Sequence, residues 1–289
     1  MTNLHLPNFL KGGLYQGAGK TVCVPGLNCY SCPAASGACP IGAFQAVVGS
    51  SKFSFSYYIT GFLILLGVLL GRFICGFLCP FGWFQELLHK IPTKKLSTKK
   101  LKPLTYLKYA VLLVMVFLLP AFLVNDVGMG DPFFCKYLCP QGVLEGAIPL
   151  SLANSGIRAA LGSLFTWKFS ILLAVIVLSI VFYRPFCKWL CPLGAFYALF
   201  NRVSLFQMKV DKNKCVSCGK CAKACKMDVD VTKTPNHAEC IRCGMCVRAC
   251  PTNAVSFRYG FGAAASGTNA DHETNGIQTN NETNTEEST

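Results

Sequence analysis

The chain of 289 residues is 52% hydrophobic and only 14% charged, and its mean hydropathy is +0.43. This composition is typical of a membrane protein and argues against an ordinary soluble domain. The formal charge of +14 would suit a nucleic-acid partner, but the basic residues lie mainly beside apolar segments. We therefore expect no nucleic-acid binding and attribute the charge to membrane topology and to compensation of bound anionic groups.

Residues 1–52 form a cysteine-rich N-terminal segment that contains Cys23, Cys29, Cys32 and Cys39. Its first 22 residues have no apolar core run, so we expect no cleavable signal peptide. A disulfide scaffold is one alternative use for the 18 cysteines of the chain. Such scaffolds are small secreted domains without a core, whereas this chain continues into long apolar segments.

Residues 53–206 are predicted to form an α-helical membrane domain with three transmembrane helices. The apolar segments are residues 53–71, 104–125 and 169–183. Crossing a bilayer takes about 20 residues, a length that the third segment reaches only with its apolar neighbours. Buried helices of a soluble protein are the alternative, which three such segments in one chain disfavour.

Lysine and arginine gather in two stretches that predict the orientation of these helices. Residues 90–102 contain six lysines, and residues 184–214 contain six basic residues. Short loops rich in Lys and Arg stay in the cytoplasm. We therefore expect a multi-pass protein of the cell membrane, with its N-terminus outside and the part after residue 206 in the cytoplasm.

A Cys-x3-Cys-Pro motif followed by glycine recurs beside the apolar segments, at residues 75–82, 135–142 and 187–194. Cys39-Pro40-Ile-Gly42 is a degenerate copy that lacks the first cysteine. Side chains four residues apart share one face of a helix, and the following proline interrupts the helix. Repeats related across a membrane often build one site from two halves.

The predicted topology brings four of these cysteines together on the cytoplasmic side: Cys75, Cys79, Cys187 and Cys191. Four thiolates are what a [4Fe–4S] cubane needs, so these residues are candidates for a cluster within the membrane domain. On the outer side six thiols exceed one cluster, and a further cluster, a disulfide and simple packing stay open. The metal-ligand candidates there are Cys29, Cys32, Cys39, Cys135 and Cys139.

Residues 207–259 carry two runs of four cysteines with the spacing Cys-x2-Cys-x2-Cys-x3-Cys. Three thiolates at this spacing can wrap one corner of a cubane, and the fourth reaches across to the other cluster. The segment is therefore predicted to be an α+β bacterial-type ferredoxin domain with two [4Fe–4S] clusters. One cluster would be held by Cys215, Cys218, Cys221 and Cys250, and the other by Cys240, Cys243, Cys246 and Cys225. Structural zinc is the alternative, but it does not require two interlocked quartets.

Residues 260–289 are rich in Asn, Thr and Glu, and we expect this tail to be disordered. The four histidines all lie outside the apolar segments. A bis-histidine haem within the membrane is therefore excluded.

The Cys-x3-Cys-Pro copies around apolar segments, followed by a double ferredoxin run, resemble the NapH/YccM group of membrane iron–sulfur proteins. Within this group, the N-terminal run Cys23-Val-Pro-Gly-Leu-Asn-Cys29-Tyr-Ser-Cys32-Pro, with Cys39-Pro-Ile-Gly, favours the YccM-like, anaerobe-type members. The resemblance covers about residues 20–258. It implies a cell-membrane electron-transfer protein, linked in some relatives to quinol oxidation. NapH-type proteins usually have four spans and two such motifs, which leaves a fourth span open here.

These observations favour a one-electron relay between a membrane or outer partner and a cytoplasmic partner. No nucleophile–base constellation is visible, so we expect an electron carrier rather than a self-contained enzyme. The partners would be an acidic ferredoxin or flavodoxin, a membrane oxidoreductase, or menaquinol. A quinol dehydrogenase component with its own quinone site and a redox- or metal-sensing regulator are the alternatives. The basic residues expected around the clusters, where they would favour the reduced state and dock an acidic partner, are Lys220, Lys223, Lys226, Arg242 and Arg248.

Overall fold

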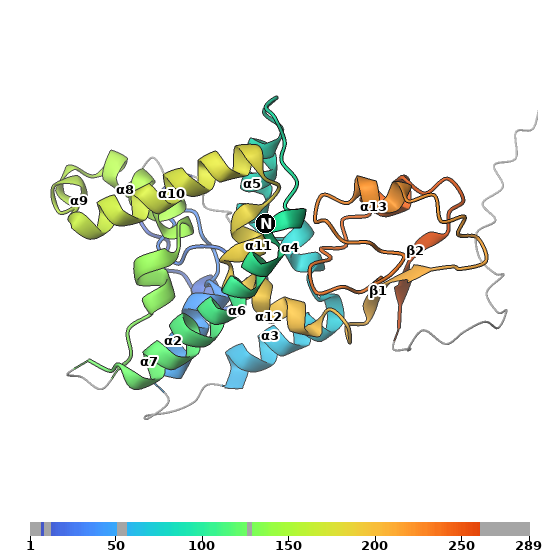
Figure 1. Cartoon of the computed structure of the whole chain (residues 1–289). Helices are drawn as coiled ribbons and strands as arrows, with labels where there is room; N and C mark the ends of the chain where they lie inside the picture. Colours follow the sequence, from blue (N-terminus) through green and yellow to red (C-terminus); the bar gives the residue numbers. More distant parts are fainter. Residues whose placement is uncertain (1–6, 9–12, 51–56, 126–128, 261–289) are drawn as a thin grey trace, which may run out of the picture.

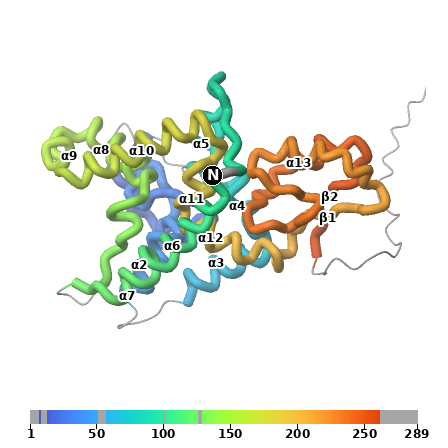
Figure 2. Tube along the Cα trace, viewed as in Figure 1, coloured from blue at the N-terminus to red at the C-terminus, as the bar shows by residue number. Residues whose placement is uncertain are grey.

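The computed structural model describes residues 7–8, 13–50, 57–125 and 129–260. The sequence predicts a disordered tail at residues 260–289, of which only residue 260 is among the described residues. The described chain divides into a helical part and a smaller C-terminal part that stands beside it, with helix α4 (Phe73–Phe77) nearest to the junction (Figures 1 and 2).

The helical part begins with a short turn of helix, η1 (Ala18–Thr21), in the N-terminal segment. Helices α2 (Pro40–Gly49) and α3 (Tyr57–Leu70) follow, and α4 leads into α5 (Pro80–His89). The 3₁₀ helix η2 (Lys99–Tyr106) leads into α6 (Leu107–Val111), the π-helical stretch η3 (Leu112–Leu118) and α7 (Leu119–Phe122). From Leu101 to Phe122 these elements form one long helix.

The second half of the helical part starts with two π-helical stretches, η4 (Phe134–Leu138) and η5 (Gly142–Ala147). Short helices α8 (Ile148–Ala153) and α9 (Ser155–Ala159) connect them to the long helix α10 (Ser163–Val181). Helices α11 (Pro185–Trp189) and α12 (Pro192–Phe200) then lead to the C-terminal part.

Two helices of the described chain have the length and composition to cross a membrane: Leu101–Phe122 and Ser163–Val181. The predicted count of three is therefore not confirmed. Helix α3, the first predicted span, has 14 residues, which at 1.5 Å per residue is shorter than the hydrocarbon core of a bilayer. Residues 53–56 of that predicted span lie outside the described residues.

Each Cys-Pro pair lies where one helix ends and the next begins. Cys39, Cys79 and Cys191 have extended backbones and form the N-caps of α2, α5 and α12, each followed by a proline at the start of the helix. Proline fits this position because the first amide of a helix needs no intrahelical partner. The second cysteine of the motif therefore lies at a helix N-terminus, where the helix dipole favours a negatively charged thiolate.

The C-terminal part has β1 (Phe206–Val210), α13 (Lys220–Ala224), α14 (Met245–Arg248) and β2 (Val255–Tyr259) in chain order. The strands pair antiparallel, from Phe206 opposite Tyr259 to Val210 opposite Val255. The hydrophobic core of the helical part extends into this region, because Met227, Val229 and Ile241 belong to the same buried cluster as Ile74. The two parts therefore share one core.

Candidate iron–sulfur centres

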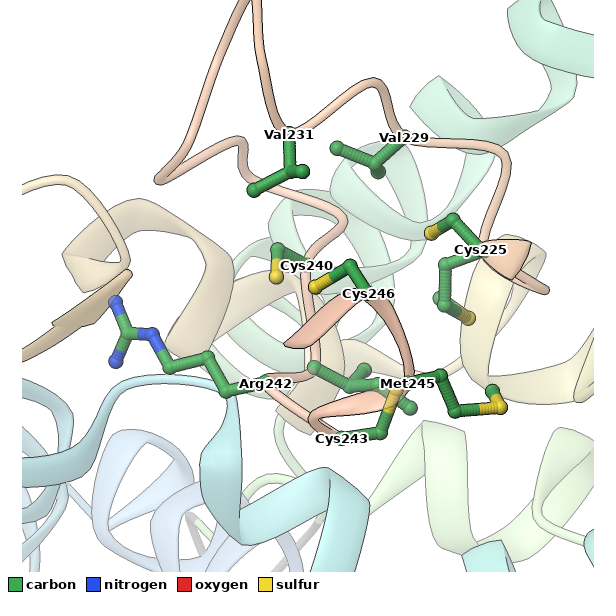
Figure 3. Close-up of a pocket in the computed structure, with 10 residues that line it drawn as sticks. Cys225, Val229, Val231, Cys240, Arg242, Cys243, Met245 and Cys246 are labelled. Carbon is green, nitrogen blue, oxygen red and sulfur yellow. The ribbon is translucent and has the colours of Figure 1, made fainter. Parts of the chain in front are cut away.

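Two pockets in the C-terminal part are each lined by four cysteines, one quartet per pocket. Quartet I consists of Cys215, Cys218, Cys221 and Cys250. Quartet II consists of Cys225, Cys240, Cys243 and Cys246. In Figure 3, Cys225 approaches the second pocket from a separate segment, while the other three come from one loop and helix α14. Each pocket thus combines three cysteines of one run with the last cysteine of the other.

The same backbone turn shapes both runs. The residues before and after the second cysteine have positive φ in each: Ser217 and Gly219 in the first run, Arg242 and Gly244 in the second. Positive φ is rare for residues other than glycine, and such residues cluster at functional sites. Asp228 and Asn253, each three residues after the last cysteine of its run, share this conformation, which Asp and Asn tolerate better than most residues. The chain therefore bends at matched places to turn the thiols inward.

The predicted cytoplasmic-side cysteines come together as quartet III: Cys75, Cys79, Cys187 and Cys191. All four are buried, with 5–6% of each residue exposed. Burial, and to a lesser degree the other three thiols of the quartet, raise the pKa of Cys191 well above the ordinary value. Burial and the neighbouring Cys187 and Cys75 thiols raise the pKa of Cys79 to about 12. The thiols of Cys79 and Cys191 are therefore held in the neutral form, and coordination to iron would deprotonate them.

Two buried arginines link the halves of quartet III reciprocally. Arg184 donates to the carbonyl oxygen of Cys75 at 2.5 Å, and Arg72 donates to that of Cys187 at 3.2 Å. Both guanidinium groups are almost fully buried. Four thiolates around an iron–sulfur core carry net negative charge, so two permanent positive charges at this distance would stabilise a bound cluster.

In two of the motifs, a glutamine from another copy of the repeat bonds the first cysteine. Gln85 donates from its amide to the Cys187 sulfur at 3.2 Å and accepts a hydrogen bond from the backbone of Phe186. Gln45 does the same for Cys135, at 3.3 Å, and for the backbone of Phe134. Both glutamines are fully buried. The degenerate copy at Cys39 therefore pairs with the motif at residues 135–142, and the motif at residues 75–82 pairs with that at residues 187–194.

The outer cysteines separate into a group of four and two others. The thiols of Cys29 and Cys39 lie close enough to Cys139 to interact with it electrostatically. The thiols of Cys29, Cys39 and Cys139 interact in the same way with that of Cys135. We call Cys29, Cys39, Cys135 and Cys139 quartet IV. Burial and these neighbours raise the pKa of Cys139 to about 12.

The remaining two cysteines are buried outside quartet IV. Cys32 is fully buried with Ala34 and Ala35. Cys23 pairs through its backbone with Ala38. The structure thus places both in the packed N-terminal segment.

The C-terminal part docks on quartet III through a buried ionic network. Glu239, next to Cys240, receives a hydrogen bond from Arg72 at 2.7 Å and another from Lys108. Burial alone would raise the pKa of Glu239, but Arg72 and Lys108 lower this pKa to about 2. On the other side, Lys188 bonds Asp228 at 3.2 Å and the backbone of Lys226. Arg72, three residues before Cys75, and Lys188, directly after Cys187, are therefore tied to the loops that carry Cys240 and Cys225.

One sequence-based assignment is wrong in its detail. Arg242 was expected on a basic face around the clusters, but only 1% of it is exposed. Its guanidinium points away from the thiols (Figure 3) and donates to the backbone of Leu70 and Asn201 and to the Ser204 hydroxyl. Arg242 therefore fastens the cluster-binding loop to the helical part. Lys220, Lys223, Lys226 and Arg248 are exposed, as expected of surface charges.

The donor sets fit iron–sulfur clusters better than single ions. Within the described ranges, no three His, Cys, Asp or Glu side chains are arranged to hold one metal ion. A cubane places each thiolate on a different iron, so its ligands surround a volume rather than converge on a point. Thiol quartets around the pockets of quartets I and II have this arrangement. A bound cluster would supply reversible one-electron transfer, while the residues around it set its potential.

Comparison with known proteins agrees with this donor chemistry. A profile of a 4Fe-4S binding domain matches residues 37–57, 54–99, 108–148 and 164–213, each segment with one copy of the Cys-Pro motif. A second profile, also of a 4Fe-4S binding domain, matches residues 208–229 and 234–256. No solved structure matches the chain.

Three relatives illustrate the similarity. Protein MJ0750 of Methanocaldococcus jannaschii is 32% identical over 209 residues, which cover 69% of this chain and 77% of that protein. YccM of Escherichia coli is 26% identical over 180 residues, 59% of this chain and 45% of YccM. The methylamine utilization ferredoxin-type protein MauN of Paracoccus denitrificans is 29% identical over 190 residues, 64% of this chain and 56% of MauN.

The fold and the cysteine sets define an iron–sulfur electron-transfer protein. The chain belongs to the NapH/YccM-like family of 4Fe-4S binding proteins.

Sequence reasoning missed the two glutamines and the docking network. Gln45 and Gln85 each lie six residues after the cysteine of a Cys-Pro pair, so this shared offset was available as a signal. The pairing of Glu239 with Arg72 and Lys108 joins residues more than 130 positions apart. No local pattern could have found it.

Proposed function

We propose that the protein is a multi-pass electron relay of the cell membrane. Single electrons pass between a cytoplasmic partner and the membrane domain through clusters at quartets I, II and III, in that order. The ferredoxin part, residues 207–259, faces the cytoplasm, and residues 53–206 form the membrane domain. The 18 cysteines thus serve mainly as cluster ligands.

The contact between quartets II and III carries this proposal. Gly76 follows Cys75, and a methyl group placed on it would lie 2.8 Å from the carbonyl oxygen of Ile241. Ile241 directly follows Cys240 in the loop of quartet II. Only glycine therefore allows this loop to rest directly on the turn that carries Cys75. The close approach of two thiol quartets is what a chain of electron carriers requires.

The exposed apolar faces of the long helices support a membrane location. Only 17% of the most apolar stretch of α10 is buried, and only 28% of the most apolar stretch of the helix Leu101–Phe122 is buried. Trp167, Leu173 and Val177 of α10 are each more than half exposed. Apolar surface of this extent is unfavourable in water and favourable in lipid. The positions of Lys108 and Arg72, at the ends of apolar helices and bonded to Glu239, support placing the ferredoxin part on the cytoplasmic side.

Quartet I supplies the entry for a soluble partner. Cys218 is exposed, and Val216 beside it is 64% exposed. Lys212, Lys214 and Lys220 flank them and are also exposed. A small apolar centre ringed by positive charge fits an acidic ferredoxin or flavodoxin, because opposite charges accelerate and orient association. At the other end, the partner would be menaquinol or a membrane oxidoreductase.

Removal of quartet III ligands tests the relay. The full chain is purified anaerobically as parent, as the Cys79→Ser/Cys191→Ser double variant, and as Cys23→Ser, a buried control outside all four quartets. The double variant should lose about four irons per chain and keep the electron paramagnetic resonance (EPR) signals of the ferredoxin part. Cys23→Ser should match the parent. Unchanged iron in the double variant would show that quartet III only packs, and the relay would end at quartet II.

A further inference from the structure

We propose that quartet IV, formed by Cys29, Cys39, Cys135 and Cys139, holds a fourth [4Fe–4S] cluster. This inference deepens the proposed relay by extending it from quartet III towards the outer side. It rests on three separate observations: a scaffold repeated from quartet III, the position of Cys29, and a chain segment that contacts both quartets.

The scaffold around quartet IV repeats that around quartet III. The Gln45 amide bonds the Cys135 sulfur as that of Gln85 bonds the Cys187 sulfur. Lys168 donates to the carbonyl oxygen of Cys135 at 3.0 Å, as Arg72 does to that of Cys187. A cation and an amide donor therefore face the same cysteine of the motif in both places. Hydrogen bonds to ligand sulfurs and nearby positive charge are the features that stabilise and tune such clusters.

Cys29 replaces the cysteine that the degenerate repeat lacks. The position four residues before Cys39 is occupied by Ala35, which is fully buried. The sulfur of Cys29 instead lies 3.7 Å from where a methyl group on Gly142 would stand. The Cys135 sulfur lies at the same distance from the corresponding point on Gly42. Cys29 precedes the first segment matched by the 4Fe-4S profile, residues 37–57, so the family match does not include it.

Cys32 is the natural competitor of Cys29, since only two residues separate them. Its backbone donates to the Cys29 carbonyl at 3.1 Å, and its side chain packs with Ala34 and Ala35. The Cys29 sulfur, by contrast, stands beside Gly142, three residues after Cys139, and Cys29 is therefore the one placed to bind the cluster.

A short N-terminal segment joins quartets III and IV. A methyl group on Gly26 would lie 2.8 Å from Cys79 Cα. The next backbone group, that of Leu27, bonds the Cys79 thiol, and that of Asn28 bonds the Cys39 thiol. Leu27 and Asn28 are buried. Consecutive residues therefore contact one ligand of each quartet, which gives electrons a short covalent and hydrogen-bonded route between the two clusters.

The test compares Cys29→Ser with Cys32→Ser in the full chain. The parent should contain about sixteen irons, four clusters of four. Cys29→Ser should contain about twelve, or about fifteen with the EPR signal of a three-iron cluster, and Cys32→Ser should match the parent. Should Cys29→Ser fail to accumulate, Cys39→Ser/Cys139→Ser and the iron content of the parent decide.

The outcomes separate this inference from the relay itself. About twelve irons in the parent, or no loss in Cys29→Ser, overturns the fourth cluster. Equal loss in Cys32→Ser overturns the assignment of Cys29. If quartet IV variants keep their iron while Cys79→Ser/Cys191→Ser loses about four, the relay stands without this extension. If the quartet III variant keeps its iron, the proposed function itself fails.

Discussion

Replacing Glu239 by glutamine should loosen the contact between the ferredoxin part and quartet III. Glu239 accepts from Arg72 and Lys108, whose side chains are fully buried, and is itself 12% exposed. Because the two cations hold its pKa to about 2, the carboxylate is ionised at neutral pH. Its contribution to docking is then fully present, and is lost only as the pH falls from the ordinary value of a glutamate towards 2.

The expected magnitude follows from the burial of this network. Removing one partner of a buried ion pair costs about 3–5 kcal/mol, because a charge is left uncompensated. Arg72 cannot lose its proton, although the glutamine oxygen can still accept one hydrogen bond. The lower end, about 3 kcal/mol, therefore applies, which raises the local opening equilibrium on the order of 10²-fold.

Amide hydrogen exchange of the full chain in detergent measures this opening. The Cys240 amide donates to the His237 carbonyl at 2.9 Å, and it should exchange about 10²-fold faster in Glu239→Gln. Asp131→Asn is the control, since the Asp131–Lys136 pair is exposed, and it should leave this amide unchanged. Exchange at Cys240 that is equal in parent and Glu239→Gln would refute the role of the buried network.

Three further predictions concern the relay and its orientation. Gly76→Val should push the loop of Ile241 away and slow electron transfer between quartets II and III in rapid-mixing EPR, with iron content unchanged. Gly61→Val is the control and should match the parent, because a methyl group there meets no atom within 4 Å. Equal transfer rates in Gly76→Val and the parent would contradict the close contact. Reporter fusions after Lys100 and Arg258 should be active in the cytoplasm and one after Gly130 outside; a Lys100 fusion active only outside would reverse the topology. Because its carboxylate accepts from the Cys29 amide at 3.2 Å, Glu145→Gln should raise the potential of the quartet IV cluster in a redox titration; an unchanged or lower potential would count against a cluster there.

The ferredoxin runs were readable from sequence because their chemistry is local. Three cysteines at intervals of three residues come from one turn, and the spacing alone predicts which cysteine crosses over. The same locality explains the Cys-Pro helix starts, where proline fixes the backbone within two residues of the ligand. The grouping of Cys75 and Cys79 with Cys187 and Cys191 followed from the repeat together with predicted topology.

The rest depends on long-range packing that no local pattern encodes. Cys29 and Cys32 are equivalent in spacing arguments, and only the fold places one of them beside Cys139. Arg242 has the sequence context of a surface cation, but contacts from Leu70 and Asn201 turn it inward. The first predicted span agrees at its C-terminal end with α3, which ends at Leu70, while its residues 53–56 lie outside the described residues.

Electron transfer across a sealed vesicle tests the relay most directly. The protein is inserted with the ferredoxin part outside, a membrane-impermeant reductant is added outside, and ferricyanide is trapped within. We expect ferricyanide to be reduced in vesicles with the parent protein, and at the rate of empty vesicles with Cys79→Ser/Cys191→Ser. A double variant as fast as the parent would contradict a relay through quartet III. Parent vesicles no faster than empty ones would contradict the route across the membrane that quartets III and IV together provide.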